Sequence, residues 1–376
     1  MDLENGIKDI VIVGAGPAGV ACAWRLAQLG YEPVLLEKET FPRDKVCGDA
    51  LSGKVVALLR KLGGDAILTD LLQQPFAHPV EYLDFFSGKG VRVRLRFPPR
   101  LGYPQGFLAP RYWFDQWLVR HLPTSVRLIT GFTVQRLQRE ADVWIVHGSE
   151  GRSIKARFVV GADGTTSRVA PIVHAYHRIP RPIVYPSVRG YIKGEPIEGL
   201  QLHFKKPYLP GYLWKFPLSD KRLNVGMALP TDSLRRANLS LRKHAAEVFP
   251  EATALGGHGI PVALQSRPLA APGCALVGDA AALADPLTGE GIGNALLSGI
   301  RLAEALARVP ITEWAISDWN ALYARPLYQE LSQQFRLMRF LHKLARSAWR
   351  LEMTIAAFSL LPIATKPLLR WYGAKD

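Results

Sequence analysis

A glycine-rich turn between two apolar segments limits the folds open to this chain more than any other feature. The segment Asp9–Val13 is rich in β-branched residues, as expected of a buried parallel strand. It leads into Gly14-Ala-Gly-Pro-Ala-Gly19, and a helical pattern over Pro17–Leu29 and a strand-like run at Pro33–Glu37 follow. This order predicts a βαβ unit whose glycines match the G-x-G-x-x-G fingerprint of dinucleotide-binding folds.

Each glycine of the fingerprint, together with one acid, has a physical role in such a site. Gly14 permits the tight turn out of the strand, and Gly16 lets the backbone approach a pyrophosphate at the positive end of the helix. Gly19 lets the helix pack closely on the strand. Glu37 stands at the end of the second strand, where its carboxylate can accept hydrogen bonds from an adenosine ribose. Because an acid disfavours a 2′-phosphate, NADP is not expected at this site.

Two later motifs favour FAD over NAD. Val159–Gly164 is typical of a strand that runs into a tight turn with an acid, Asp163, and Cys274–Asp279 is a second strand with an acid at its tip. Such an acid can bind a ribityl hydroxyl of FAD. The run Asp285–Ile292 then opens a helix, whose glycine amides can face the flavin edge where negative charge collects on reduction.

With these motifs the sequence resembles the FAD-dependent hydroxylases and reductases related to para-hydroxybenzoate hydroxylase, over most of residues 9–310. The resemblance implies a mixed α/β (α+β) fold: a Rossmann-like FAD-binding domain, an interleaved antiparallel-sheet substrate domain and a C-terminal helical segment. It also implies two arginines near the cofactor. The cofactor-binding residues expected are Gly14, Ala15, Gly16, Ala18, Gly19, Glu37, Lys38, Arg43, Cys47, Gly48, Arg111, Val134, Asp163, Gly278, Asp279, Pro286, Gly289, Gly291 and Ile292.

The expected domains interleave along the chain. Apolar residues alternate with arginines over Val91–Phe97, which predicts a hairpin at Tyr82–Phe97. The proline- and aromatic-rich stretch Pro180–Pro230 has strand-like runs and no long helix, as expected of a separate antiparallel sheet. The predicted boundaries are 1–80, 106–178 and 266–310 for the FAD-binding domain, 81–105 for the hairpin, 179–265 for the substrate sheet and 311–376 for C-terminal helices.

Two local features resemble the geranylgeranyl reductases within this superfamily. The first is Lys45-Val-Cys47-Gly48, and the second is Tyr212-Leu-Trp214-Lys-Phe216-Pro217. Strand alternation puts Tyr212, Trp214 and Phe216 on one face, where they could hold an isoprenoid chain against a flavin ring. The resemblance implies reduction of isolated double bonds of a prenyl lipid by hydride transfer from reduced flavin, with these three aromatics as substrate-binding residues.

Such a reduction needs more than a hydride. An isolated alkene accepts hydride poorly, so a proton donor must act on the other carbon. Cys47 is the candidate catalytic residue, and the alternative is that it is only a small buried side chain. No second nucleotide fingerprint is visible, so the external reductant is either NAD(P)H docking transiently or a reduced protein donor.

Two other functions are compatible with the motifs. A flavin-dependent monooxygenase or halogenase would use the same FAD site, although halogenases of this fold carry Trp-x-Trp-x-Ile-Pro where this chain has Tyr212–Pro217. A non-catalytic prenyl carrier is the third reading, and the intact FAD motifs count against it.

The charge of the chain needs an anionic partner. Lys and Arg number 47 against 32 Asp and Glu, a formal net charge of +15. No helix-turn-helix, RNP or zinc pattern points to nucleic acid, and the scattered histidines and three spaced cysteines predict neither a metal site nor a disulfide framework.

The basic residues near the C-terminus suggest where that partner binds. A predicted helix places basic residues beside an apolar stripe. Either the stripe packs on the core and the basic face is only solvated, or the helix makes peripheral contact with a phospholipid surface. With no signal peptide or spanning segment visible, we expect a cytoplasmic protein. The basic residues of this face are Arg336, Arg339, Lys343, Arg346 and Arg350.

Overall fold

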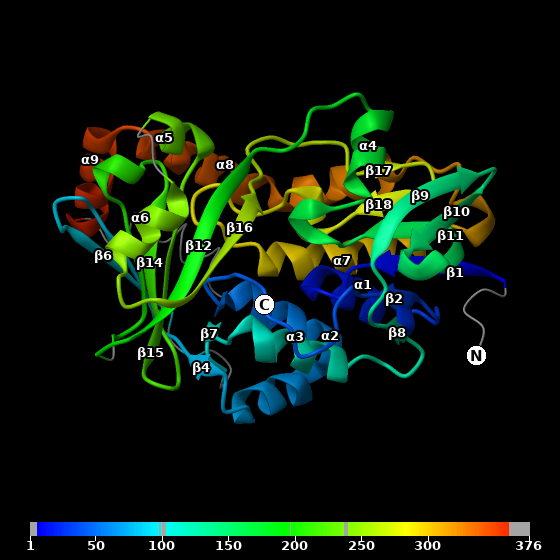
Figure 1. Cartoon of the computed structure of the whole chain (residues 1–376), viewed down its shortest axis with the longest axis horizontal. Helices are drawn as coiled ribbons and strands as arrows, with labels where there is room; N and C mark the ends of the chain where they lie inside the picture. Colours follow the sequence, from blue (N-terminus) through cyan, green and yellow to red (C-terminus); the bar gives the residue numbers. More distant parts are fainter. Residues whose placement is uncertain (1–5, 98, 100–102, 196, 237–239, 361–376) are drawn as a thin grey trace.

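The computed structural model describes residues 6–97, 99, 103–195, 197–236 and 240–360 as a mixed α/β fold built around two large sheets (Figure 1). The eight-stranded sheet and its helices lie on one side of the molecule, and the seven-stranded sheet lies on the other. This is the expected fold class. The predicted domain boundaries remain predictions.

The eight-stranded sheet has a parallel centre in the order β18-β11-β1-β2-β8, as the glycine fingerprint predicts. Antiparallel strands extend it: β17 pairs with β18, β10 with β11 and β9 with β10. The strands are β1 Ile7–Val13, β2 Val34–Leu36, β8 Arg127–Ile129, β9 Val134–Glu140, β10 Val143–Gly148, β11 Ser153–Gly161, β17 Ala270–Ala271 and β18 Cys274–Leu276.

Two helices pack closely beside this sheet. They are α1, Pro17–Gln28, and α7, Ile292–Leu306. A side chain at Gly299 of α7 would place its Cβ 2.3 Å from the carbonyl oxygen of Ala18, so only glycine permits this approach. The other helices here are α2 Gly53–Gln73, α3 Arg111–Arg120 and α4 Ala170–Tyr176, and sequence reasoning did not predict α2.

The seven-stranded sheet has the order β16-β12-β15-β14-β13-β5-β6 and is antiparallel except where β13 pairs with β5. It joins the predicted hairpin to the predicted sheet after residue 180, although about a hundred residues of sequence separate them. Its strands are β5 Tyr82–Phe86, β6 Arg92–Arg96, β12 Val184–Lys193, β13 Leu200–His203, β14 Tyr212–Pro217, β15 Arg222–Ala228 and β16 Thr253–Pro261.

The remaining elements are short. A small sheet has the order β3-β7-β4, with β3 Ala50–Leu51, β7 Phe107–Leu108 and β4 His78–Pro79, and in sequence its strands are interspersed among those of the large sheets. Two helices, α5 Thr231–Arg236 and α6 Leu241–Val248, accompany the seven-stranded sheet. Single turns of 3₁₀ or π helix are η1 Ser149–Gly151, η2 Gly164–Thr166, η3 Lys206–Tyr208, η4 Gly278–Ala281, η5 Ile311–Glu313 and η6 Asn320–Ala324.

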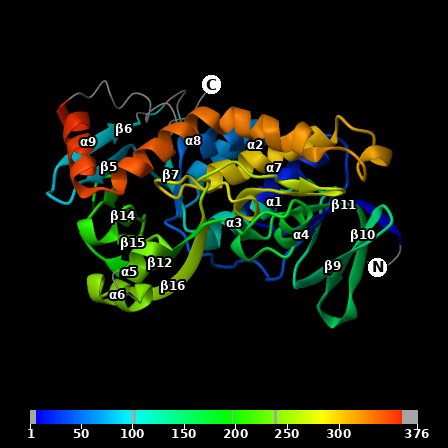
Figure 2. The ribbon, with the colours of Figure 1, turned by 90° about the horizontal axis from the view of Figure 1, so that it is seen from above.

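The prediction of one basic helix face near the C-terminus is wrong in two respects. The segment forms two helices, α8 Arg325–Ala345 and α9 Ala348–Leu360. Arg339 turns inward, since its Nε donates to the carbonyl of Ala263 at 2.8 Å and its guanidinium lies over the Phe335 ring. Figure 2 shows α8 running along the molecule to α9, which packs against β6. None of the described helices is long and apolar enough to cross a membrane.

Candidate active site

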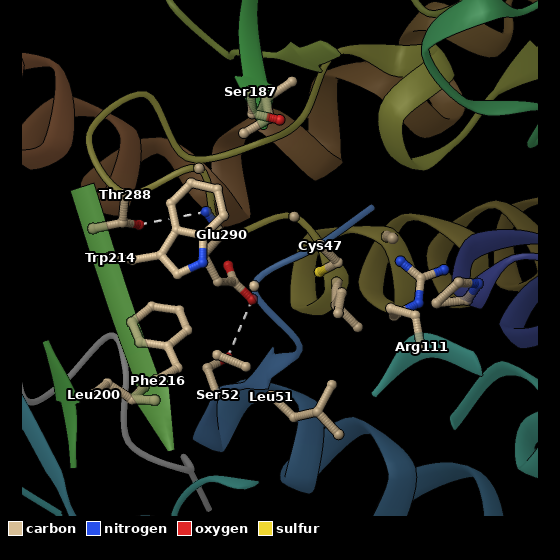
Figure 3. Close-up of a pocket in the computed structure, with 18 of the residues that line it drawn as sticks. Cys47, Leu51, Ser52, Arg111, Ser187, Leu200, Trp214, Phe216, Thr288 and Glu290 are labelled. Atoms are coloured by element: carbon tan, nitrogen blue, oxygen red, sulfur yellow. Dashed lines mark hydrogen bonds between the residues drawn. The ribbon is translucent and has the colours of Figure 1, made fainter. Parts of the chain in front are cut away.

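A cavity of about 220 Å³ brings most of the predicted motifs together (Figure 3). Its walls come from the start of α1, the start of α7, the Lys45–Ser52 segment and the seven-stranded sheet. Twelve of the predicted residues line it. They are Gly16, Ala18, Cys47, Gly48, Arg111, Tyr212, Trp214, Phe216, Asp279, Gly289, Gly291 and Ile292.

The glycine turn has the geometry that a pyrophosphate requires. Gly14 has φ +102°, and a Cβ there would lie 2.4 Å from the carbonyl oxygen of Ala162. A Cβ at Gly19 would lie 1.9 Å from the carbonyl oxygen of Gly14. A Cβ at Gly16 would meet only Arg43 Nη2, at 3.9 Å, so the space above this residue is open. The turn is closed where it packs and open where a cofactor phosphate would lie.

A chain of buried ion pairs stands beside this turn. The Glu37 carboxylate accepts a hydrogen bond from the Ala15 amide at 3.0 Å and lies 3.4 Å from Arg43 Nη2. Arg43 Nη1 lies 2.9 Å from Asp115, which also receives two hydrogen bonds from Arg111. Arg43 Nε is buried with no protein partner among the described residues, which leaves a donor spare for an anionic cofactor.

These ion pairs control the charge of Asp115. Burial disfavours its carboxylate form, but Arg111 and Arg43 outweigh that effect and hold the pKa below its usual range. Asp115 is therefore ionised, and it fixes both arginines close to the turn.

The two acids at strand tips differ. Asp279 lines the cavity and forms an ion pair with Lys45 at 2.9 Å. Burial favours a higher pKa for this carboxyl, but Lys45 together with His258 and Arg111 outweighs burial and holds the pKa below its usual range. The Asp163 carboxylate turns back to its own loop, where it accepts from Ser167 Oγ at 2.5 Å and the Arg168 amide at 2.6 Å. Asp163 does not line the cavity, whereas its neighbour Gly164 does.

The remaining predicted residues lie around the cavity rather than on it. Lys38 is exposed and 3.4 Å from Glu39, and Val134 is buried in β9. Gly278 has φ +60°, and a Cβ there would lie 2.8 Å from Ala18 Cβ, so it permits close packing. The predicted residues outside the lining are Gly14, Ala15, Gly19, Glu37, Lys38, Arg43, Val134, Asp163, Gly278 and Pro286.

The aromatic row on β14 is confirmed as one face of a strand. The ring centroids of Tyr212 and Trp214 are 6.2 Å apart, and those of Trp214 and Phe216 are 6.4 Å apart. All three rings line the cavity. A Cβ at Gly48 would lie 2.8 Å from Phe216 Cε2, so glycine lets the segment containing Cys47 contact this row.

Sequence reasoning missed a buried network behind the cavity. Asp49 is fully buried and accepts hydrogen bonds from the Arg111 amide (3.1 Å), Asn224 Nδ2 (2.7 Å) and the Tyr191 hydroxyl (3.1 Å). Asn224 also donates to the Cys47 carbonyl at 2.9 Å. Burial raises the pKa of Asp49 to about 6, although these bonds oppose the rise. Asp49 follows Cys47-Gly48 in the sequence, whereas no sequence signal marked Asn224.

Comparisons with known proteins identify a family and several relatives. Residues 8–182 match the family described as FAD binding domain. The chain is 30% identical to menaquinone reductase of Mycolicibacterium smegmatis over 382 residues, 94% of this chain and 91% of that protein. It is 26% identical to digeranylgeranylglycerophospholipid reductase 1 of Methanopyrus kandleri over 345 residues, 87% of each.

Solved structures share the fold. A geranylgeranyl bacteriochlorophyll reductase-like protein from Thermoplasma acidophilum superposes with a TM-score of 0.79 at 19% identity, covering 93% of this chain and 91% of that one. Flavin-dependent halogenases are also among the structures with this fold. At these identities the likeness establishes the architecture alone. The expected FAD-dependent oxidoreductase is confirmed by the family match and the relatives.

The Asp49 network gives a testable prediction. Asp49→Asn puts an amide donor opposite the Asn224 amide, so buried hydrogen bonds are lost and the free energy of unfolding falls by about 1–3 kcal/mol. Asp65→Asn is the control, because Asp65 forms an exposed pair with Arg60 and its loss costs at most about 1 kcal/mol. Denaturant unfolding measures both, and equal losses in the two variants would contradict the role given to Asp49.

Proposed function

Because the chain belongs to the geranylgeranyl reductase family of FAD-dependent flavoproteins, we propose that it reduces isolated carbon–carbon double bonds in the prenyl chain of a lipid. The observation that carries the proposal is the aromatic row Tyr212, Trp214 and Phe216, which shares one cavity with the residues that fit FAD. Menaquinone and digeranylgeranylglycerophospholipid, named in the relatives, both carry prenyl chains, which supports this substrate class.

The polar end of the cavity fits FAD. Amides at the start of α1, with Arg43, would hold the pyrophosphate, and Glu37 would accept from the ribose. Asp279 is suited to a ribityl hydroxyl, and the amides at the start of α7 to the flavin edge. When bound and reduced, the flavin supplies a hydride. The external reductant in this proposal is NAD(P)H or a reduced protein.

The apolar end of the cavity fits a prenyl chain. Buried and half-buried side chains from β5, β7 and β13, and from the residues that follow β4 and β6, line this end with the aromatic row. Each methylene buried there contributes about 0.8 kcal/mol. Binding along this wall would hold one double bond beside the flavin and exclude water. The apolar lining residues are Val80, Leu83, Phe97, Phe107, Leu200 and Leu202.

Cys47 is the proposed proton donor. It lines the cavity between Arg111 and the Trp214 ring (Figure 3). Burial raises the pKa of the Cys47 thiol, and this effect outweighs the opposing charge of Arg111. The thiol therefore stays protonated at neutral pH, and Sγ can give its proton to one alkene carbon as hydride reaches the other.

The direct test is turnover without oxygen. We expect reduced, FAD-loaded protein to hydrogenate a polyprenyl lipid anaerobically, with two hydrogens gained per double bond by mass spectrometry. Product that forms only with oxygen present would support a monooxygenase or halogenase instead. A colourless protein that binds prenyl lipid without FAD would support a non-catalytic carrier. Either result would overturn the proposal.

Cys47→Ala tests the proton donor. We expect the rate of double-bond reduction to fall about 10²-fold or more while the FAD absorbance is retained, because loss of a general acid costs about 10²–10⁴-fold. Cys22→Ala, which removes a buried thiol from α1 outside the cavity, is the control and should keep full activity. An unchanged rate in Cys47→Ala would show that another group delivers the proton.

We also propose peripheral contact with anionic lipid through the α8–α9 end of the molecule. Large apolar side chains are exposed there: Phe340 (57%), Trp349 (67%), Met353 (65%) and Leu360 (79%). Exposed cations flank them on the same helices. Such a mixture of apolar and cationic side chains suits the interface of a phospholipid bilayer, which is also where a prenyl lipid would be found.

Two distant segments add charge to this surface. A Cβ at Gly88 in the β5–β6 turn would lie 3.2 Å from Glu352 of α9 and 4.0 Å from the Lys206 amide, so the three segments meet. Lys89 in this turn, and Lys205 and Lys206 at the start of η3, are exposed. Each lysine near an anionic surface contributes about 1 kcal/mol to binding.

Liposome sedimentation measures this contact. Changing Trp349 and Met353 to Ser, or Lys89, Lys205 and Lys206 to Glu, is expected to reduce binding to vesicles of anionic phospholipid. Ile316→Ser removes an exposed apolar side chain elsewhere and should bind like the unmodified protein. Equal binding of all variants, or no preference for anionic over neutral vesicles, would reject this surface.

A further inference from the structure

Glu290 stands between the two glycines that open α7, and the proposed function leaves it without a role. We propose that its carboxylate lowers the reduction potential of the bound flavin and so makes the reduced flavin a stronger hydride donor. The inference rests on the FAD site and not on the identity of the lipid.

The position of Glu290 is fixed by its hydrogen bonds. Its Oε1 accepts from the Gly293 amide at 2.9 Å and from the Ser52 hydroxyl at 3.1 Å. The side chain lines the cavity, and Figure 3 shows it between Ser52 and the ring of Trp214. Both donors are neutral groups, so they hold the carboxylate in place without cancelling its charge.

That charge lies at the helix end that would otherwise stabilise reduced flavin. The first amides of a helix carry about half a positive elementary charge, and negative charge collects on the flavin when it is reduced. Gly291 and Ile292 line the cavity at this helix start, whereas the Gly293 amide already donates to Glu290. A full negative charge on the first turn offsets the helix end, so reduction of the flavin is favoured less.

The cations that line the cavity are already paired. Lys45 forms its ion pair with Asp279, and Arg111 forms its two hydrogen bonds with Asp115. The Lys54 stem lies beside Gly293, and its Nζ donates to the side-chain oxygens of Asn294 and Gln334 at 2.7 Å each.

A buried group nearby responds to the same field. The pKa of Asp285 rises to about 6, mainly through burial, and the charge of Glu290 adds to the rise. The electrostatic effect of Glu290 therefore reaches the interior of the loop that carries Gly289 and Gly291.

A lower potential suits the proposed reaction. An isolated alkene is a weak hydride acceptor, so transfer to it benefits from a strongly reducing donor.

The test is the midpoint potential of the FAD-loaded protein, measured anaerobically against reference dyes without any lipid. In Glu290→Gln, which keeps the shape and the acceptor, the equilibrium should shift at least tenfold toward reduced flavin. For a two-electron couple this is a rise of about 30 mV. The flavin spectrum and the melting temperature check that the variant folds and holds its cofactor.

Three further variants separate charge from structure. Glu290→Asp keeps the charge, Ser52→Ala removes one hydrogen bond but no charge, and Glu313→Gln removes an exposed charge outside the cavity. All three should stay close to the unmodified potential. An unchanged or lower potential in Glu290→Gln, or an equal rise in Glu290→Asp, would overturn the inference. Because no lipid is present, failure to reduce prenyl lipids would leave this result unaffected.

Discussion

The site depends on the contact between the Cys47–Asp49 segment and strand β14. Gly48 has no side chain, so the Phe216 ring can lie where a Cβ would be 2.8 Å from it. Asn224 connects this segment to the sheet through hydrogen bonds. It donates to the Cys47 carbonyl and to the Asp49 carboxylate, and it accepts from Trp214 Nε1 at 2.8 Å. This contact places the aromatic row in the same cavity as the residues that fit FAD.

Much of the fold could be predicted because local signals were sufficient. A glycine that needs a positive φ, a strand buried on both faces and an aromatic alternation are each visible within a few residues, as at Gly14 and on β14. Pairings that depend on tertiary contact were not predictable. Asn224 meets Asp49 across 175 residues of sequence, and no local pattern marks it. Asp163 was predicted as a cofactor ligand from its place at a strand tip, and no local pattern indicated that its carboxylate accepts from Ser167 and two loop amides.

The basic residues behind the formal charge of +15 lie in several different environments. Around the glycine turn, Arg43 and Arg111 are buried against Asp115 and leave a donor for the cofactor. On the edge strand β6, Arg92 and Arg94 both pair with Asp84, and Arg94 also pairs with Glu198. Inside the cavity, Glu290 works against the positive helix end.

In the proposed reaction, reduced flavin and the prenyl chain meet in one cavity, and hydride passes directly from the flavin to a double bond. Anaerobic single turnover measures this hydride transfer. Protein with fully reduced FAD is mixed with a polyprenyl lipid, and flavin reoxidation is followed by absorbance. The reaction is then quenched, and the product is identified by mass spectrometry. We expect flavin reoxidation that matches the loss of one double bond per flavin and that is slower in Cys47→Ala. Flavin that stays reduced in the presence of every prenyl lipid tested, yet reoxidises to form product when oxygen is admitted, would contradict it.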